Sequence, residues 1–296
     1  MSITAFAFAE NDTLASSVAS HLPANFSCVD IHRFPDRESC VRIKPDDVTD
    51  VCIVFASLND PDVKTLSLIF LSETLRDYGA ERIILVAPYL SYMRQDKRFK
   101  EGEGVTAQYY ARLISKYYDA LITVDPHLHR IHNLNDIYSI PTKVLHAAPV
   151  VADWIKDNIE NALLIGPDSE SEQWVSDLSQ RANTPFIVLE KTRYGDHEVC
   201  VSVPHVEEWL RHQPVLFDDI ISTGKTMIET ITHLKNAGLS PPLCIGIHAV
   251  FSDQSCQELQ AAGTERIITT NTIPHSSNAI DISQLIVDSL KELLKL

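Results

Sequence analysis

The stretch LFDDIISTGKTM, residues 216–227, carries acidic, hydroxyl and basic side chains at close spacing. It ends in Gly-Lys-Thr, like the Walker A loop that binds nucleoside triphosphates. A Walker A loop also has a glycine five positions before its Gly-Lys pair, and this chain has Asp219 there. The stretch is therefore a different kind of loop, and the adjacent acids Asp218 and Asp219 need their own explanation.

A helix that begins within residues 222–226 would present backbone N–H groups to an anion. Hydroxyls and a lysine add hydrogen bonds and positive charge to this segment, which consists of Ser222, Thr223, Gly224, Lys225 and Thr226. The two carboxylates before it can accept hydrogen bonds from neighbouring hydroxyls. A monophosphate with a diol close by describes ribose 5-phosphate. The alternative is a solvated acidic turn followed by an ordinary capped helix.

Short apolar runs, each followed by a helical pattern, must position these side chains. β-Branched runs separated by helices predict buried parallel strands in βαβ units. The runs cover residues 3–9, 51–58, 82–89, 120–125, 162–165, 185–189, 199–203, 214–217, 243–250 and 266–270. Ligands of such open sheets bind beyond the carboxyl ends of the strands, where several of these runs are followed by polar residues.

The chain has 296 residues, which is enough for two domains of ordinary size. The pattern places a boundary near residues 145–152, where AAPVVADW opens a helix. We therefore expect an α/β fold with two similar domains, 1–147 and 148–296, each a mostly parallel sheet flanked by helices.

Composition and charge exclude some classes of function. The net charge of −15 disfavours binding to nucleic acid. No apolar run approaches the roughly 18 residues of a membrane span, and the opening MSITAFAFAEND is predicted to be a strand, because it lacks the basic start of a signal peptide. None of the six cysteines is spaced as C-x-x-C, so we expect reduced thiols in a cytoplasmic protein.

The loop VLFDDIISTGKTM, residues 215–227, resembles the phosphoribosyl diphosphate (PRPP) loop shared by type I phosphoribosyltransferases and PRPP synthetases. The resemblance implies that Asp218 and Asp219 hold the ribose 2- and 3-hydroxyls and that residues 222–226 hold the 5-phosphate. It also implies a phosphoribosyltransferase-type fold for both domains. This loop alone does not separate enzymes that make PRPP from enzymes that consume it.

A second segment favours the enzymes that make PRPP. Residues 88–98 read PYLSYMRQDKR, which is similar to the Pro-Tyr-x-x-Tyr-x-Arg-Gln-Asp-Lys segment of PRPP synthetases. The resemblance implies that Arg94 and Gln95 contact ATP, with Asp96 beside them. A guanidinium group suits this role because it binds phosphate oxygens in a bidentate manner. For an isolated charged segment, a solvated loop would be the simpler interpretation.

Two further segments concern the metal. Asp125-Pro126-His127 is similar to the family's Asp-Leu-His, whose histidine lies by the Mg–ATP phosphates. Mg²⁺ prefers oxygen ligands, so His127 meets it through water or binds a phosphate instead. Gly166-Pro167-Asp168 matches the family's Pro-Asp, which makes Asp168 a candidate contact to Mg²⁺ or ribose. The usual glycine-rich continuation is replaced here by SESEQW, whose acids would repel a diphosphate.

Lys191-Thr192-Arg193 resembles the Lys-x-Arg of the family's flexible catalytic loop. Positions two apart on a strand share one face, so Lys191 and Arg193 could both reach the phosphate being transferred. Positive charge there would stabilise the transition state of diphosphoryl transfer. A lone Lys-Thr-Arg would more simply be a polar strand exit.

Residues 34–38, FPDRE, resemble the family's Phe-x-Asp-Gly-Glu, which receives adenine, often across a subunit interface. The resemblance implies that Phe34 stacks on the base and that Asp36 and Glu38 accept hydrogen bonds from its amine. Arg37 replaces the family's glycine, which is costly if the position needs a positive φ.

These segments, which occur in the family's order, lead us to expect a ribose-phosphate diphosphokinase. It would convert ATP and ribose 5-phosphate to AMP and PRPP, with Mg²⁺ as cofactor and no dedicated general base, and would form a homo-oligomer of two or more chains. One alternative is a PRPP-consuming phosphoribosyltransferase, which would leave RQDKR and KTR unexplained. Another is a non-catalytic regulatory subunit, which Arg37 and the SESE segment favour.

Overall fold

The computed structural model describes residues 2–167, 171–194, 198–202, 204, 206–252 and 254–296. The chain folds into two compact units. Unit 1 comprises Met1–His146, Thr272–Pro274 and Ile282–Leu296, and unit 2 comprises Ala147–Asn271 and His275–Asp281.

Unit 1 is built around a parallel sheet. Its elements are β1 Ile3–Ala7, α1 Asp12–Ser20, β2 Asn25–Cys28, β3 Asp30–Arg33, β4 Ser39–Arg42, β5 Val51–Phe55, α2 Pro61–Asp77, β6 Arg82–Ala87, α3 Thr106–Tyr117, β7 Ala120–Val124, β8 Thr142–Leu145 and α9 Ser283–Leu294, with 3₁₀ turns at Ala9–Asn11, Pro45–Asp47 and Leu134–Asp136. The strand order is β2-β1-β5-β6-β7-β8, and every pairing in it is parallel.

Unit 2 contains a second parallel sheet. Its elements are α4 Ala148–Asn158, β9 Ala162–Gly166, α5 Glu172–Ala182, β10 Phe186–Val188, β11 Glu190–Tyr194, β12 Glu198–Ser202, α6 Val206–Trp209, β13 Gln213–Ile221, α7 Lys225–Asn236, β14 Leu243–Ala249, α8 Ser255–Ala262, β15 Arg266–Thr270 and β16 Asn278–Ile280. The strand order is β10-β9-β13-β14-β15-β16, again parallel throughout.

The two units share one topology. Counted within each sheet, the strand order is 2-1-3-4-5-6 in both, and an antiparallel hairpin follows the second strand in both: β3–β4 in unit 1 and β11–β12 in unit 2. In a sheet of this order, the connections after the first and third strands leave in opposite directions and open a crevice for ligands. The crevice lies between β1 and β5 in unit 1, and between β9 and β13 in unit 2.

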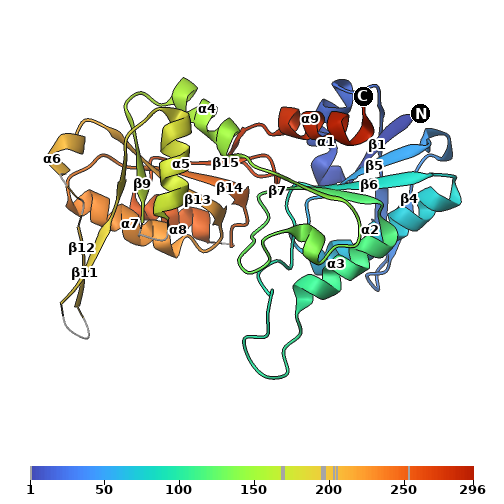
Figure 1. Cartoon of the computed structure of the whole chain (residues 1–296), viewed down its shortest axis with the longest axis horizontal. Helices are drawn as coiled ribbons and strands as arrows, with labels where there is room; N and C mark the ends of the chain where they lie inside the picture. The colour runs from blue at the N-terminus through green and yellow to red at the C-terminus, as the bar shows by residue number, and fades with distance from the viewer. Residues whose placement is uncertain (1, 168–170, 195–197, 203, 205, 253) are drawn as a thin grey trace. The chain divides into compact units, whose positions relative to one another are not determined.

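Helices cover both faces of each sheet (Figure 1). In unit 1, α1 packs with α9 and α2 packs with α3; in unit 2, α4 packs with α5 and α7 packs with α8. Strands such as β5, β6 and β7 are buried almost throughout, as expected of parallel strands with both faces covered. The predicted α/β class, with one architecture used twice, is confirmed. Within the described ranges, no helix combines the length and the apolar character needed to cross a bilayer.

The last helix belongs to unit 1. Ile286, Val287 and Leu290 of α9 are fully buried, and the helix packs against α1 and β8. The sequence-based division at 147/148 lies one residue from the break between His146 and Ala147, but it places 282–296 in the second domain. The apolar stripe of a helix shows that the helix needs a partner, and it does not show which sheet supplies that partner.

Candidate active site

Asp218 and Asp219 lie near the end of β13, at the crevice of unit 2. Strand β13 is buried from Pro214 to Leu216 and half-buried from Phe217 to Ile220. Burial, followed by the negative charge of Asp219 and a hydrogen bond with its side chain, raises the pKa of Asp218 to about 7. Two carboxyl groups held this closely favour a ligand that donates hydrogen bonds or carries positive charge.

The predicted phosphate segment leads into helix α7. Gly224 is the N-cap of α7 with φ 66°, and Lys225 is the first helical residue. A Cβ at position 224 would lie 3.1 Å from the side chain of Leu259 on α8, so both the positive φ and the close packing favour glycine. Thr223, Lys225 and Thr226 are exposed and Ser222 is half-buried. The segment therefore offers a helix N-terminus, hydroxyls and an ammonium group to an anion.

Gly246 on the neighbouring strand is a residue that the sequence analysis missed. It pairs with Asp218 in the β13–β14 register. A Cβ there would lie 2.6 Å from the side chain of Ile221, the last residue of β13. Gly246 thus makes room for the turn that follows the acids. A glycine inside an apolar strand was the available signal, because it commonly marks a close approach of backbone or side chains.

The remaining predicted residues of unit 2 lie on two other elements. Gly166 ends β9, beside β13, and Asp168 lies outside the described residues. Of the SESE acids, Glu172 is exposed at the start of α5. Lys191 and Arg193 lie on β11, opposite Val201 and Val199 of β12, so they occupy alternate positions of one strand in the hairpin.

In unit 1, the segment 88–104 follows β6. Arg94 is exposed, as a phosphate contact would need. Gln95 donates from Nε2 to Oε2 of Glu103 at 3.0 Å, and the same oxygen accepts from the backbone N–H groups of Phe99 and Lys100 at 2.9 and 3.0 Å. These backbone hydrogen bonds lower the pKa of Glu103. Gln95 therefore has an internal partner in the loop, while Arg94 remains directed to solvent.

Asp96 is paired with a residue of the next loop. Its side chain is 2% exposed, and its carboxylate accepts from the backbone N–H of Arg130 at 3.0 Å and from the Arg130 guanidinium at 3.1 Å. Burial works to raise the pKa of Asp96, but the hydrogen bonds and charge of Arg130 outweigh it, so the pKa is lowered. Asp96 thus joins the loop after β6 to the loop after β7, which carries His127.

His127 lies three residues beyond β7. It is half-buried, and its ring lies 5.7 Å from that of His129 in an edge arrangement. Asp125, which precedes it, has a φ of 35°, and its Oδ1 lies 2.9 Å from Nδ1 of His146 in a hydrogen bond. The loops after β6 and β7 leave the same edge of the sheet, so the structure brings His127 and the Arg94 segment to one edge of unit 1.

The predicted adenine segment forms the tight turn of the β3–β4 hairpin. The N–H of Phe34 donates to the carbonyl of Glu38 at 2.9 Å, and the N–H of Arg37 donates to that of Phe34 at 2.8 Å. Arg37 has a φ of 74°, so the position does adopt the conformation that favours glycine. Phe34 is 46% exposed, and Asp36 and Glu38 are exposed too. The turn therefore presents an aromatic face and two carboxylates to solvent.

The side chains suited to Mg²⁺ are carboxylates. Among the described residues, no three His, Cys, Asp or Glu side chains gather into a metal-binding cluster. In phosphate-transfer sites, however, Mg²⁺ usually has one or two protein carboxylates and takes its other ligands from substrate phosphates and water. Asp218 and Asp219 fit that donor set, because a cation would offset both the burial and the negative charge of Asp219 that raise the pKa of Asp218.

Comparison with known proteins assigns both units. A family model described as the N-terminal domain of ribose phosphate pyrophosphokinase matches residues 3–117, and a phosphoribosyl transferase domain model matches residues 133–282. A ribose-phosphate pyrophosphokinase of Methanopyrus kandleri is 30% identical over 97% of this chain and 98% of its own. One from Sulfolobus acidocaldarius is 33% identical over 84% and 86%. The crystal structure of phosphoribosylpyrophosphate synthetase from Mycobacterium smegmatis shares the fold, with a TM-score of 0.82 at 23% identity, covering 100% of this chain and 99% of that one.

Proposed function

Because the chain belongs to the ribose-phosphate pyrophosphokinase family, we propose that it transfers the β,γ-diphosphoryl group of ATP to ribose 5-phosphate, giving PRPP and AMP. The observation that carries the proposal is the arrangement on β13 and α7. Two adjacent carboxyl groups are followed directly by a glycine-capped helix N-terminus, at the crevice of a doubly wound sheet. A sugar diol beside a phosphate matches this pair of features.

In this proposal the sugar binds in unit 2. Asp218 and Asp219 accept hydrogen bonds from the ribose 2- and 3-hydroxyls, and Ser222, Thr223, Gly224, Lys225 and Thr226 hold the 5-phosphate. The C1 hydroxyl oxygen then attacks the β-phosphorus of ATP and gives up its proton to solvent water, the bond from that phosphorus to the oxygen of the α-phosphate breaks, and AMP leaves with that oxygen. Lys191 and Arg193 stabilise the charge on the transferred group.

The nucleotide binds through segments of unit 1. Arg94 contacts its phosphates, helped by His127, and the turn with Phe34, Asp36 and Glu38 receives the base. Gln95 and Asp96 shape the loop around Arg94 through the internal hydrogen bonds described above. Mg²⁺, held by substrate phosphates with carboxylates of this chain including Asp168, would supply positive charge that offsets the repulsion between the reactants. A homo-oligomer of at least two chains, located in the cytoplasm, completes the proposal on the family resemblance alone.

The test is AMP formation from Mg–ATP with and without ribose 5-phosphate, followed by phosphorus NMR of the product. We expect AMP only when the sugar is present, together with a diphosphate on C1. Saturable binding of ribose 5-phosphate without turnover would contradict catalysis and indicate a regulatory subunit. Consumption of PRPP in the presence of a nucleobase, without synthesis from ATP, would indicate a phosphoribosyltransferase.

A further inference from the structure

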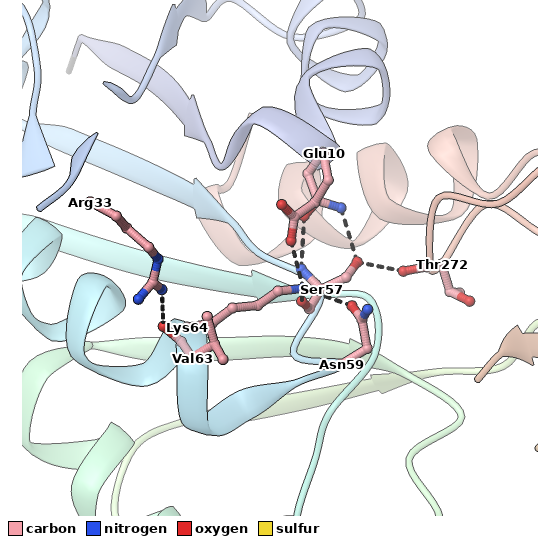
Figure 2. Close-up of polar contacts among 8 residues, drawn as sticks. Glu10, Arg33, Ser57, Asn59, Val63, Lys64 and Thr272 are labelled. Atoms are coloured by element: carbon pink, nitrogen blue, oxygen red, sulfur yellow. Dashed lines mark hydrogen bonds and ion pairs between the residues drawn. The ribbon is translucent and has the colours of Figure 1, made fainter. Parts of the chain in front are cut away.

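The first turn of α2, residues 61–64, is tied to several parts of unit 1 by polar contacts (Figure 2). This turn follows β5, at the crevice that corresponds by topology to the proposed sugar site of unit 2. In unit 2, the strand at the crevice leads into the proposed phosphate segment, residues 222–226. In unit 1, the corresponding strand β5 leads into the first turn of α2, which carries Lys64.

The Lys64 ammonium joins the carboxyl ends of β1 and β5. Its Nζ lies 2.5 Å from Oε1 of Glu10, which follows β1, and 2.8 Å from both the carbonyl of Ser57 and Oδ1 of Asn59, which follow β5. An ammonium group has three hydrogens to donate, and these contacts provide three oxygen acceptors. The Lys64 side chain is only 14% exposed. This network therefore fixes the first turn of α2 against the edge of the sheet.

Ser57, whose carbonyl accepts from Lys64, is itself held by buried hydrogen bonds. The N–H of Ser57 donates to Oδ1 of Asn11 at 2.8 Å, and Nδ2 of Asn11 donates to Oγ of Ser57 at 2.9 Å. Oγ of Ser57 in turn donates to the carbonyl of Thr272 at 2.5 Å. Asn11 and Ser57 are both buried. One of the three oxygens that Lys64 contacts therefore belongs to a residue fixed in the buried network of unit 1.

The same turn of α2 holds the hairpin that carries the adenine segment. The guanidinium of Arg33 donates to the carbonyl of Val63, beside Lys64, at 2.6 Å (Figure 2). Arg33 ends β3 and directly precedes Phe34, and β4 packs against α2. A displacement of residue 63 would therefore move the start of the turn formed by residues 34–38.

It also holds the loop that carries Arg94. The hydroxyl of Tyr92 donates to the carboxylate of Asp62. Burial, then this hydrogen bond and the charge of Asp62, raises the pKa of Tyr92 to about 12, so the hydroxyl keeps its proton at neutral pH. Tyr92 has a φ of 64°, which is a strained conformation for a tyrosine. Its side chain is held by the hydrogen bond to Asp62 and by packing on Tyr110, with 4.6 Å between the two ring centroids.

We propose that Lys64 is a positioning residue for the nucleotide. By fixing the first turn of α2, it sets the adenine segment, tethered through Arg33, and the phosphate segment, tethered through Tyr92, at a defined separation. The inference rests on the proposed function, because the two segments are nucleotide contacts only if that function holds. Lys64 itself touches no substrate, and acts through Val63 and Asp62.

The experiment compares Lys64→Met with Lys143→Met in steady-state assays. Methionine keeps most of the apolar stem and removes the ammonium group. Lys143 is a matched control, because it also bonds to a glutamate, Oε2 of Glu292 at 2.8 Å, but on an exposed surface of the same unit. We expect Lys64→Met to raise the KM for ATP about tenfold or more, as loss of a charged hydrogen-bond network would, with the KM for ribose 5-phosphate changed less than about twofold. Lys143→Met should change neither.

An independent readout is amide hydrogen exchange, which needs no turnover. In Lys64→Met, the N–H groups of Phe34 and Arg37 should exchange faster, while those of β13 keep their wild-type rates. Unchanged KM for ATP and unchanged exchange would overturn the proposal. Equal increases in both KM values would assign Lys64 a general structural role and also overturn it.

Two other outcomes of the experiment, a variant that does not fold and a wild-type protein without activity, also have defined consequences. If Lys64→Met does not fold, Arg33→Gln cuts the adjacent tether at an exposed side chain and must itself raise the KM for ATP, or the proposal fails. If the wild-type protein makes no PRPP, the proposed function fails instead, and faster exchange at residues 34–38 in Lys64→Met would still support the mechanical part of the inference.

Discussion

The carboxyl groups of Asp218 and Asp219 show how one pair of side chains makes both folding and binding depend on pH. The folded chain raises the pKa of Asp218 from 3.8 to about 7, so folding favours its protonated form. Its contribution to the free energy of unfolding is therefore fully present below pH 3.8 and is lost as the pH rises toward 7. Binding of a diol or a cation needs the ionised carboxylate, so affinity should change with pH in the opposite direction.

We accordingly predict that the affinity for ribose 5-phosphate falls as the pH is lowered below about 7, approaching tenfold per pH unit. Asp218→Asn should bind more weakly at pH 8 but lose this part of the pH dependence. Isothermal titration of both proteins across pH measures the difference. The sugar phosphate titrates near pH 6 itself, which affects both proteins equally. Parallel pH profiles for the two proteins would contradict the assignment of the titration to Asp218.

Lys191 gives the second prediction at this scale. Lys191→Ala should lower kcat by about a hundredfold or more, because it removes the ammonium group that stabilises the negative charge of the transferred group. Binding of ribose 5-phosphate should change little. Lys235→Ala, which removes an exposed lysine from the last turn of α7, is the control and should leave kcat unchanged. A kcat for Lys191→Ala within about twofold of wild type, a barrier change of only about 0.4 kcal/mol, would show that the proposed role is wrong.

Asp96 marks the limit of what residue types reveal. The family resemblance of residues 88–98 implies that Asp96 lies beside ATP. The structure gives its carboxylate to Arg130, 34 positions along the chain. That partner could not be inferred from spacing, because the contact depends on two loops leaving neighbouring strands at the same edge. The acids at 218 and 219 were easier to interpret, since their neighbours in sequence are also their neighbours in space.

Among the elements, the β3–β4 hairpin contains a turn residue other than glycine at positive φ. Its turn puts Arg37 at φ 74°, where a residue with a Cβ costs roughly 1–2 kcal/mol. We predict that Arg37→Gly raises the free energy of unfolding by roughly 0.5–1 kcal/mol, since glycine relieves the strain but loses more chain entropy on folding. Denaturant unfolding followed by a probe in unit 1 measures the change.

Arg37→Ala is the matched control for that experiment. It removes the guanidinium group as Arg37→Gly does, but keeps the Cβ and therefore the strain. We expect it to show no gain in stability. An equal gain in both variants would assign the effect to the lost charge and would contradict the backbone argument.

For the secondary-structure elements, the sequence identified which segments are strands better than it located where those strands end. Apolar β-branched runs identified the parallel strands, for example β5, β7 and β14, because strands buried on both faces have no polar alternation. The run at 214–217 was extended by the structure to Gln213–Ile221, past the two acids. Polar residues inside a strand hide its end, since pairing with β14 continues through them.

For the molecule as a whole, α9 couples the last residues of the chain to the stability of unit 1. Leu290 is fully buried in that packing. We predict that Leu290→Ala lowers the free energy of unfolding of unit 1 by about 2–4 kcal/mol. Hydrogen exchange should show faster amide exchange in α1 and β8, with β13 and α7 unchanged. The exposed neighbour Lys291 provides the control as Lys291→Ala, and equal acceleration in both units would contradict this selective effect.

The architecture was largely predictable because strand and helix patterns repeat along the chain. What the sequence did not show was that the two sheets have the same strand order, or that residues 282–296 belong to unit 1. Both facts depend on which buried faces pair over long distances, and many pairings satisfy the same apolar pattern. The candidate site was predictable in unit 2, where β13 runs directly into α7. It was less so in unit 1, where its parts are held by Lys64, Arg33 and Arg130.

The position of α9 also has a consequence for biosynthesis. Residues up to His146 leave the ribosome long before residues 282–296 are made, a delay on the order of ten seconds at ordinary rates of translation. During that interval the face of α1 that α9 will cover stays open to solvent or to other chains. The strands of the unit 2 sheet all precede α9 in the chain, ending at Ile280. A chain truncated within the last helix would therefore contain every strand of the unit 2 sheet but lack part of the helix that packs on α1 and β8 of unit 1.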